Sequence, residues 1–374
     1  MRRRHFLGTA GVIGTTLAMG AGGRVATATA PVGADGLVRT DLWARGAGGA
    51  RLFVREVLTA DDAHGSGRGL GRGRRGRPAR SLLLVHGARP GGAAAFDLPV
   101  PGGSLAADLA RSGYAVYVMD IRGFGHSDLP PAMTQDPAAN PPQVRSNEAV
   151  ADIDAAVALI RRRRGPAGPP AALGWATGGH WLGMYAALHP DRIADLMVLN
   201  TLYAGTSPWP LHAELADPEN PDEPRPQAAW RAVTADSLTA RWDSGLAGAD
   251  PDARRDPAVR DAYREAALSA DPTSGSRTPP SFRNPTGPLI DAFYQSRGRQ
   301  FYDASLVRAR TLVLRGDQDF WSRPEDSERL ALHLTGAGAV RVRTLRGASH
   351  YLHLERERYG RGQLLAEVRD FLGP

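Results

Sequence analysis

The chain of 374 residues contains no cysteine and no lysine. The first absence excludes disulfide bonds, thiolate nucleophiles and metal sites with cysteine ligands. The second leaves arginine as the only strongly basic residue. We attribute the lack of lysine, together with the 44 glycines and 29 prolines, to a compositional bias of the coding DNA. The sequence also lacks the P-loop and HExxH patterns of nucleotide and metal sites, so we expect no cofactor and no metal.

The net charge of +7 does not indicate nucleic-acid binding, because most of the excess is confined to two segments. The first 28 residues carry four arginines and no acid. Six more lie in a glycine-rich stretch: Arg68, Arg72, Arg74, Arg75, Arg77 and Arg80. These ten charges exceed the net charge, so the rest of the chain is mildly acidic. We interpret residues 61–80 as a flexible surface loop and expect no nucleic-acid partner.

The N-terminus has the three parts of an export signal. Arg3 and Arg4 precede His5, Phe6 and Leu7, residues 8–20 are mostly apolar or small, and residues 26–28 form an A-x-A cleavage motif. The arginine pair resembles a twin-arginine signal, so we predict a signal peptide over residues 1–28 and export by the twin-arginine machinery to a secreted or extracytoplasmic location. The apolar run is too short and too rich in glycine and threonine for stable membrane insertion.

Short apolar runs alternate with helical patterns along the body of the chain. The runs are residues 82–85, 115–119, 171–175, 196–199, 311–314 and 340–345, and residues 51–58 alternate like a half-buried strand. This order predicts an α/β fold whose mainly parallel sheet is flanked by helices. The pattern lapses over residues 203–305, which we predict to be an inserted cap or lid in a core made of residues 31–202 and 306–374.

Four groups of residues follow these predicted strands, and their order is more specific than any group alone. They are His86-Gly87-Ala88, residues 120–127 (DIRGFGHS), residues 174–179 (GWATGG), and a final pair formed by residues 316–319 (GDQD) and 347–350 (GASH). In this order the groups resemble the α/β-hydrolase superfamily, close to its esterase, lipase and peptidase-like branches. The resemblance covers residues 81–205 and 309–372.

The resemblance implies a nucleophile elbow, G-x-S-x-G, in which Gly174 and Gly178 let the strand and the helix approach closely. It implies that His350 is the general base and that Asp319 orients it. We prefer Asp319 to Asp317 because the family places its acid at the last position of the GxxD motif.

The resemblance also implies an oxyanion hole made by the backbone N–H groups of Ala88 and Thr177. His86 and Gly87 would then be structural residues of the turn that presents Ala88. We expect a small-molecule substrate whose pocket includes Trp175, Trp181 and Trp321, although ordinary core packing also explains aromatic residues near these motifs.

Position 176 holds alanine, where covalent catalysis needs serine. One explanation is that Thr177 is the nucleophile of a motif shifted by one residue, which would place the bulky Trp175 at the crowded position. A second is a natural protein that has lost hydrolysis. A third is a Ser→Ala variant that silences an enzyme and keeps its pocket. We favour the third, because a site abandoned by evolution has no physical reason to retain His350 and Asp319.

With serine at position 176, we expect a serine-type hydrolase that cleaves an ester, lactone or amide of a hydrophobic small molecule. A ligand-binding protein on the same fold is the main alternative. A lyase or isomerase that uses His350 as a base, without a covalent step, is the weaker one.

Overall fold

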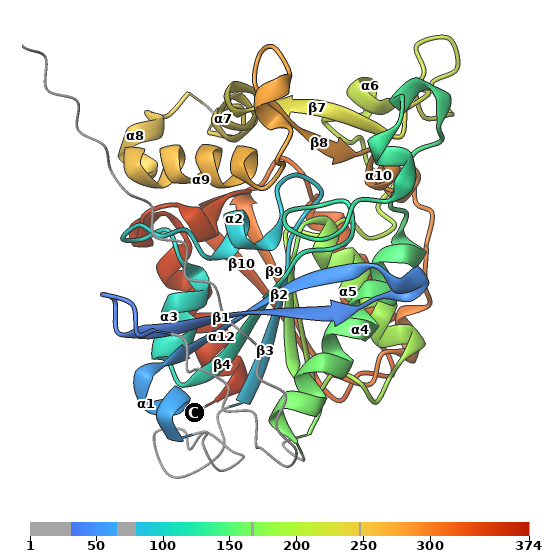
Figure 1. The fold of residues 1–374 in the computed structure, drawn as a ribbon. Helices are drawn as coiled ribbons and strands as arrows, with labels where there is room; N and C mark the ends of the chain where they lie inside the picture. The colour runs from blue at the N-terminus through green and yellow to red at the C-terminus, as the bar shows by residue number, and fades with distance from the viewer. Residues whose placement is uncertain (1–30, 66–79, 166–167, 247, 374) are drawn as a thin grey trace, which may run out of the picture. The chain divides into compact units, whose positions relative to one another are not determined.

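A computed structural model of the chain describes residues 31–65, 80–165, 168–246 and 248–373. Within these residues, eight strands form one sheet in the order β1-β2-β4-β3-β5-β6-β9-β10 (Figure 1). Strand β2 is antiparallel to β1 and β4, and the other neighbours are parallel. The strands are β1 (Leu37–Arg45), β2 (Arg51–Thr59), β3 (Arg80–Val85), β4 (Tyr114–Met119), β5 (Ala171–Trp175), β6 (Asp195–Leu199), β9 (Arg310–Gln318) and β10 (Val340–Ser349).

Helices cover both faces of this sheet, which explains why its central strands are apolar throughout. Successive side chains of a strand point to opposite faces. Accordingly, Leu82 and Leu84 of β3 belong to one apolar cluster, and Leu83 and Val85 belong to another. The first cluster includes α2 (Gly92–Phe96), α3 (Leu105–Arg111) and α12 (Arg361–Leu372), and the second includes α4 (Ser146–Arg164), α5 (Thr177–Leu188) and α11 (Pro324–His333). The predicted fold class is confirmed.

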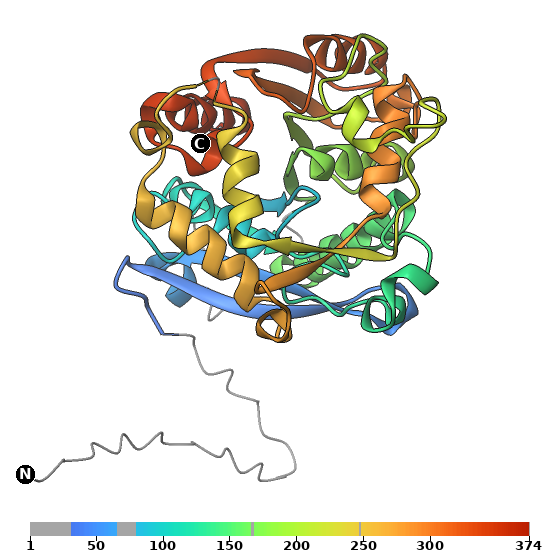
Figure 2. The same cartoon turned by 90° about the horizontal axis from the view of Figure 1, so that it is seen from above.

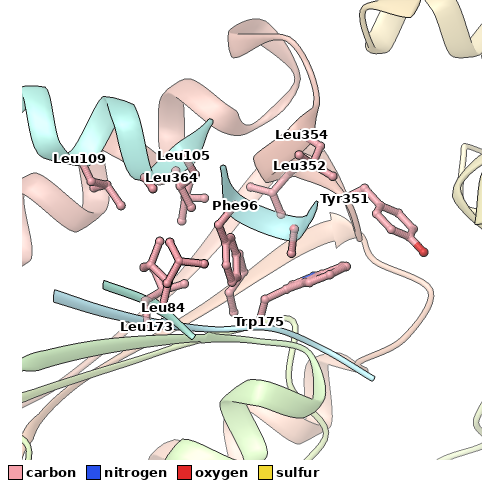
Figure 3. Packing of buried hydrophobic residues seen from close by; sticks show 14 of the residues in the cluster. Leu84, Phe96, Leu105, Leu109, Leu173, Trp175, Tyr351, Leu352, Leu354 and Leu364 are labelled. Atoms are coloured by element: carbon pink, nitrogen blue, oxygen red, sulfur yellow. The ribbon is translucent and has the colours of Figure 1, made fainter. Parts of the chain in front are cut away.

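The first cluster extends from the middle of the sheet to the ends of its strands (Figure 3). Leu84 and Leu173 lie on the neighbouring strands β3 and β5, which pair in parallel. At the end of β5, Trp175 packs against Tyr351 with ring centroids 5.4 Å apart. The residues that follow the strands are therefore supported by the hydrophobic core itself.

Strand β1 has no counterpart in the strands predicted from the sequence. It pairs with β2 over its whole length, from Leu37 opposite Thr59 to Arg45 opposite Arg51. Its buried and accessible residues do not alternate regularly, because most of its middle residues are partly or fully accessible. A pattern of period two was therefore absent from the sequence.

The predicted loop at residues 61–80 is wrong at both ends. Residues 61–65 belong to helix α1 (Ala60–Gly65), whose first turn is capped because the Thr59 hydroxyl accepts a hydrogen bond from the Asp62 N–H at 3.2 Å. Arg80 is the first residue of β3. The rest of the predicted loop, and the predicted signal peptide, lie outside the described residues. None of the described helices is long and apolar enough to cross a bilayer.

The predicted insertion at residues 203–305 includes a small sheet of its own, in which β7 and β8 pair antiparallel. In Figure 1, α7, α8, α9 and these strands lie together above the main sheet, and Figure 2 looks down on them. That the insertion acts as a cap remains a prediction. Its elements are α6 (His212–Leu215), β7 (Trp230–Thr234), α7 (Ala235–Asp243), α8 (Pro251–Arg254), α9 (Pro257–Ser269), β8 (Ser281–Pro285) and α10 (Gly287–Ser296).

The insertion is fastened to the segment that follows β10 through one buried carboxylate. Glu355 accepts hydrogen bonds from the indole of Trp242 at 3.0 Å and from Arg254 at 3.0 Å. It also accepts a hydrogen bond from the Ser349 hydroxyl at 2.6 Å. Because Arg254 and Glu355 are both buried, loss of either one would leave a buried charge without its partner.

A buried histidine joins three helices on the other face of the sheet. The Ser146 hydroxyl lies 3.1 Å from Nε2 of His180 and donates to Asp291 at 2.7 Å. Since this hydroxyl has only one proton, it accepts from Nε2, and His180 carries its proton there. Burial lowers the pKa of His180 to about 4, although the charge of Asp291 opposes the shift.

His180 makes the stability of the chain depend on pH. An unfolded histidine titrates near 6.5, so below that pH the unfolded chain binds a proton that the folded chain refuses until about pH 4. The free energy that neutral His180 contributes to the folded state is complete above pH 6.5, and it falls by roughly 1.4 kcal/mol per pH unit below that pH. We expect His180→Gln to lose stability less steeply than the parent between pH 6.5 and 4.5 in urea unfolding. Equal slopes for the two chains would contradict this.

Candidate active site

The groups predicted to carry chemistry all follow strands of the parallel part of the sheet. His86 follows β3, Asp120 follows β4, Ala176 follows β5, Asp319 follows β9 and His350 follows β10. The carboxyl ends of parallel strands lie at one edge of a sheet, where open α/β sheets bind their ligands. The structure thus brings residues as far apart in the chain as His86 and His350 to the same edge.

Ala176 occupies a strained turn between β5 and α5. Its backbone angles are φ 53° and ψ −118°, a region that side chains with a Cβ adopt at a cost of about 1 kcal/mol or more. A Cβ on Gly174 would collide with the Gly178 carbonyl, and one on Gly178 would collide with the Val85 carbonyl. Residue 176, and not Thr177, therefore has the elbow geometry, since Thr177 is the first residue of α5.

Ala176 faces a pocket that the core and the predicted insertion share. Part of the lining belongs to the elbow, the turn after β3 and the loops after β9 and β10: Gly87, Ala88, Arg89, Trp175, Ala176, Thr177, Phe320, Trp321, His350 and Tyr351. The insertion supplies the rest: Leu211, Glu214, Leu215, Arg231, Arg241 and Leu289. A ligand above residue 176 would thus contact both parts of the chain.

The N–H groups of Ala88 and Thr177 have no hydrogen-bond partner among the described residues. The first N–H groups of a helix have no acceptor within it, which explains the free N–H of Thr177 at the start of α5. A Cβ built on Gly87 would lie 3.3 Å from the Cβ of Ala176, so the turn passes directly beside the elbow. The two N–H groups border one pocket, as two donors to an oxyanion must.

The side chain of His86 stabilises this turn through contacts of both ring nitrogens. Its Nε2 accepts the N–H of Ile121 at 3.1 Å, and its Nδ1 lies 2.6 Å from the Gly87 carbonyl. These partners require a neutral ring with its proton on Nδ1. Burial lowers the pKa of His86, against the charge of Asp120, and so favours the neutral ring. Asp120 itself accepts the Gly92 N–H at 2.5 Å, which connects the start of α2 to the end of β4.

His350 and Asp319 form a buried pair. Nδ1 of His350 lies 2.7 Å from Oδ1 of Asp319, whose side chain is fully buried. Asp319 also accepts the N–H groups of Trp321 at 3.1 Å and Ser322 at 2.7 Å, and the Ser322 hydroxyl. These donors fix the carboxylate and leave Nε2 of His350 free to act in the pocket. Asp317 is exposed and makes no such contact.

Asn200 contacts the backbone of His350 and was not among the residues singled out from the sequence. It follows β6 with a φ of 53°, and its side chain is completely buried. Its amide donates to the His350 carbonyl at 3.2 Å and accepts the Gly316 N–H at 2.8 Å. The Trp175 indole donates to the same His350 carbonyl at 3.0 Å. Asn200 thus connects the backbone of His350 to β9, the strand that Asp319 follows. Its only signal in the sequence was a lone Asn at the end of an apolar run.

The predicted aromatic pocket is partly wrong. Trp175 and Trp321 line the pocket, but Trp181 does not. Trp181 is buried on the other face of the sheet, where its ring lies 6.1 Å from His86 and 6.2 Å from Phe124. It projects from α5 away from the elbow, so core packing explains it.

A family model described as the alpha/beta hydrolase fold matches residues 81–357, so the chain belongs to the α/β-hydrolase family. No curated protein matches the sequence significantly.

Solved structures of similar fold include a thioesterase domain from the curacin biosynthetic pathway, with a TM-score of 0.54 and 15% identity over 88% of this chain and 99% of that one. The enol-lactonase of Burkholderia xenovorans has a TM-score of 0.54 and 19% identity over 88% and 99% of the two chains. An esterase of Exiguobacterium antarcticum has a TM-score of 0.52 and 12% identity over 89% and 99%. At these identities the likeness concerns the fold.

The geometry distinguishes the two candidate acids. In a chain that carries Ala176→Ser, we expect Asp319→Asn to lower kcat on an activated ester on the order of 10⁴-fold, because the imidazole loses the partner that orients it. Asp317→Asn is the matched control, since this exposed neighbour makes no contact with His350, and it should change kcat less than twofold. A larger loss from Asp317→Asn than from Asp319→Asn would contradict the assignment.

Proposed function

We propose that this site is that of a serine-type acyl hydrolase whose nucleophile is replaced by Ala176. With serine there, the protein would hydrolyse an ester, lactone or amide of a largely hydrophobic small molecule. The observation that carries the proposal is the 2.7 Å contact between His350 and Asp319, because His350 lines the same pocket as the elbow residue. Membership of the α/β-hydrolase family supports hydrolysis as the reaction class.

The positions of the groups suggest how each would act on the substrate. The hydroxyl that Ala176→Ser introduces attacks the carbonyl carbon, and Nε2 of His350 takes its proton. The oxyanion that forms is stabilised by the N–H groups of Ala88 and Thr177. When the tetrahedral intermediate collapses, His350 returns the proton to the departing alcohol or amine. His350 then deprotonates a water molecule, which attacks the acyl-enzyme and releases the acid.

With Ala176 the covalent step has no nucleophile, but the pocket and the oxyanion donors are present. We propose that the chain binds its substrate without acylation, as a Ser→Ala variant would. Two observations favour this over a natural loss of function. The alanine tolerates a strained backbone without gaining an interaction from it, and the His350–Asp319 pair is retained although nothing in the chain uses it.

We further propose that the protein is exported by the twin-arginine machinery, on the sequence of residues 1–28 alone. The absence of cysteine is compatible with this export route and with others, so it does not support the proposal. The proposal predicts that a folded protein, and not an extended chain, crosses the membrane.

The direct test is the substitution Ala176→Ser. We expect it to raise kcat on a panel of 4-nitrophenyl esters by up to about 10⁶-fold over the parent chain, because removing such a serine has an effect of this order. His350→Ala in the serine background should abolish most of the gain. If the parent, the serine variant and the double variant hydrolyse every ester equally slowly, the proposal fails.

A further inference from the structure

Three guanidinium groups line the pocket above Ala176. Arg89 lies in the turn after β3, Arg231 is on β7 and Arg241 is on α7. Glu214 is the only carboxylate among the described residues that line this pocket. The cluster is therefore positively charged, and it sits where the substrate of the proposed function would bind.

Arg241 is neutralised within the protein. One of its Nη atoms donates to Glu214 at 3.2 Å, the other forms a second and shorter contact with the same carboxylate, and the guanidinium lies 5.8 Å from the Phe320 ring centroid. Glu214 is thereby used by Arg241, and it does not form an ion pair with either of the other two arginines.

Arg89 and Arg231 have no such partner. Within the part of the chain that the structure describes, neither side chain makes a hydrogen bond or an ion pair, and Nε of Arg231 is buried without an acceptor. Burial, and then the charges of Arg89 and Arg241, lower the pKa of Arg231 to about 10, against the charge of Glu214. Both side chains are partly buried, and a cation partly removed from water without a counter-ion is destabilised, so an anion from outside the chain would stabilise it.

We propose that Arg89 and Arg231 bind a carboxylate on the substrate. A guanidinium offers N–H groups in a planar fork that matches a carboxylate, so two such groups select for it. An apolar part of the lining is supplied by Leu211, Leu215, Leu289, Phe320 and Trp321. This inference rests on the proposed function and narrows it: the substrate is a hydrophobic ester or lactone that carries a carboxylate away from the carbonyl under attack.

Binding to the chain with Ala176 tests this without any turnover. The probes are the mono-4-nitrophenyl ester of adipic acid, which carries a carboxylate, and 4-nitrophenyl hexanoate, which has the same chain length and no charge. Quenching of tryptophan fluorescence by the nitrophenyl group reports binding, because Trp175 and Trp321 line the pocket. We expect the carboxylate ester to bind at least about tenfold more tightly, as charge-assisted hydrogen bonds allow.

The variants Arg231→Gln and Arg89→Gln should each reduce this preference about tenfold. Arg264→Gln is the matched control, because Arg264 pairs with the exposed Asp236 on the surface of the insertion and does not line the pocket. It should leave the preference unchanged. Far-ultraviolet circular dichroism checks that each variant is folded, and the two separate arginine variants keep the test valid if one of them is not.

The same pair of esters separates this inference from the proposed function. If Ala176→Ser cleaves neither ester but the parent chain prefers the carboxylate, the anion site stands and the hydrolase proposal fails. If Ala176→Ser cleaves both esters with equal kcat/KM, the hydrolase stands and the carboxylate site is overturned. Three results of the binding experiment also overturn the site. In the first the parent binds both esters equally, and in the second it binds neither. In the third Arg231→Gln loses affinity for both esters to the same extent.

Discussion

The close approach of β5 and α5 is the constraint on which the site depends. Because Gly174 lacks a side chain, β5 meets α5 within backbone contact, and Gly178 lets α5 approach the end of β3; the residue between them has a φ of 53°. That turn raises residue 176 into the pocket and leaves the N–H of Thr177 without a partner inside the helix. Gly87 adds a second close approach, which brings the turn after β3 beside the elbow. An alanine in this position carries the strain of the turn without the chemistry for which such turns are used.

Three sets of contacts stabilise the segment around His350. Asp319 holds the ring, Asn200 and Trp175 hold the backbone carbonyl of His350, and Glu355 connects the residues after the loop to α7 and α8 of the insertion. The insertion and the segment around His350 are therefore parts of one hydrogen-bonded assembly.

The sequence predicted the central strands and the order of the motifs, because both are local signals. A strand buried on both faces is a continuous apolar run, and residues 82–85 and 171–175 are such runs. β1 was missed because its exposure does not alternate, and Trp181 was misplaced because the motif does not show which face of α5 it occupies. Arg89, Arg231 and Asn200 were missed for another reason. Each is ordinary in its own segment, and its place beside the pocket or beside His350 depends on segments that are distant in the sequence.

We propose that residue 176 is the nucleophile position of an acyl hydrolase, with His350 as the base and the N–H groups of Ala88 and Thr177 as the oxyanion donors. The most direct measurement is the intact mass of the chain and of its Ala176→Ser variant after reaction with a fluorophosphonate, whose phosphorus is attacked by an activated serine with loss of fluoride. We expect one phosphonyl group on the variant, located at residue 176 by peptide mapping, and none on the parent. An unmodified variant, or a parent modified at Thr177, would contradict it.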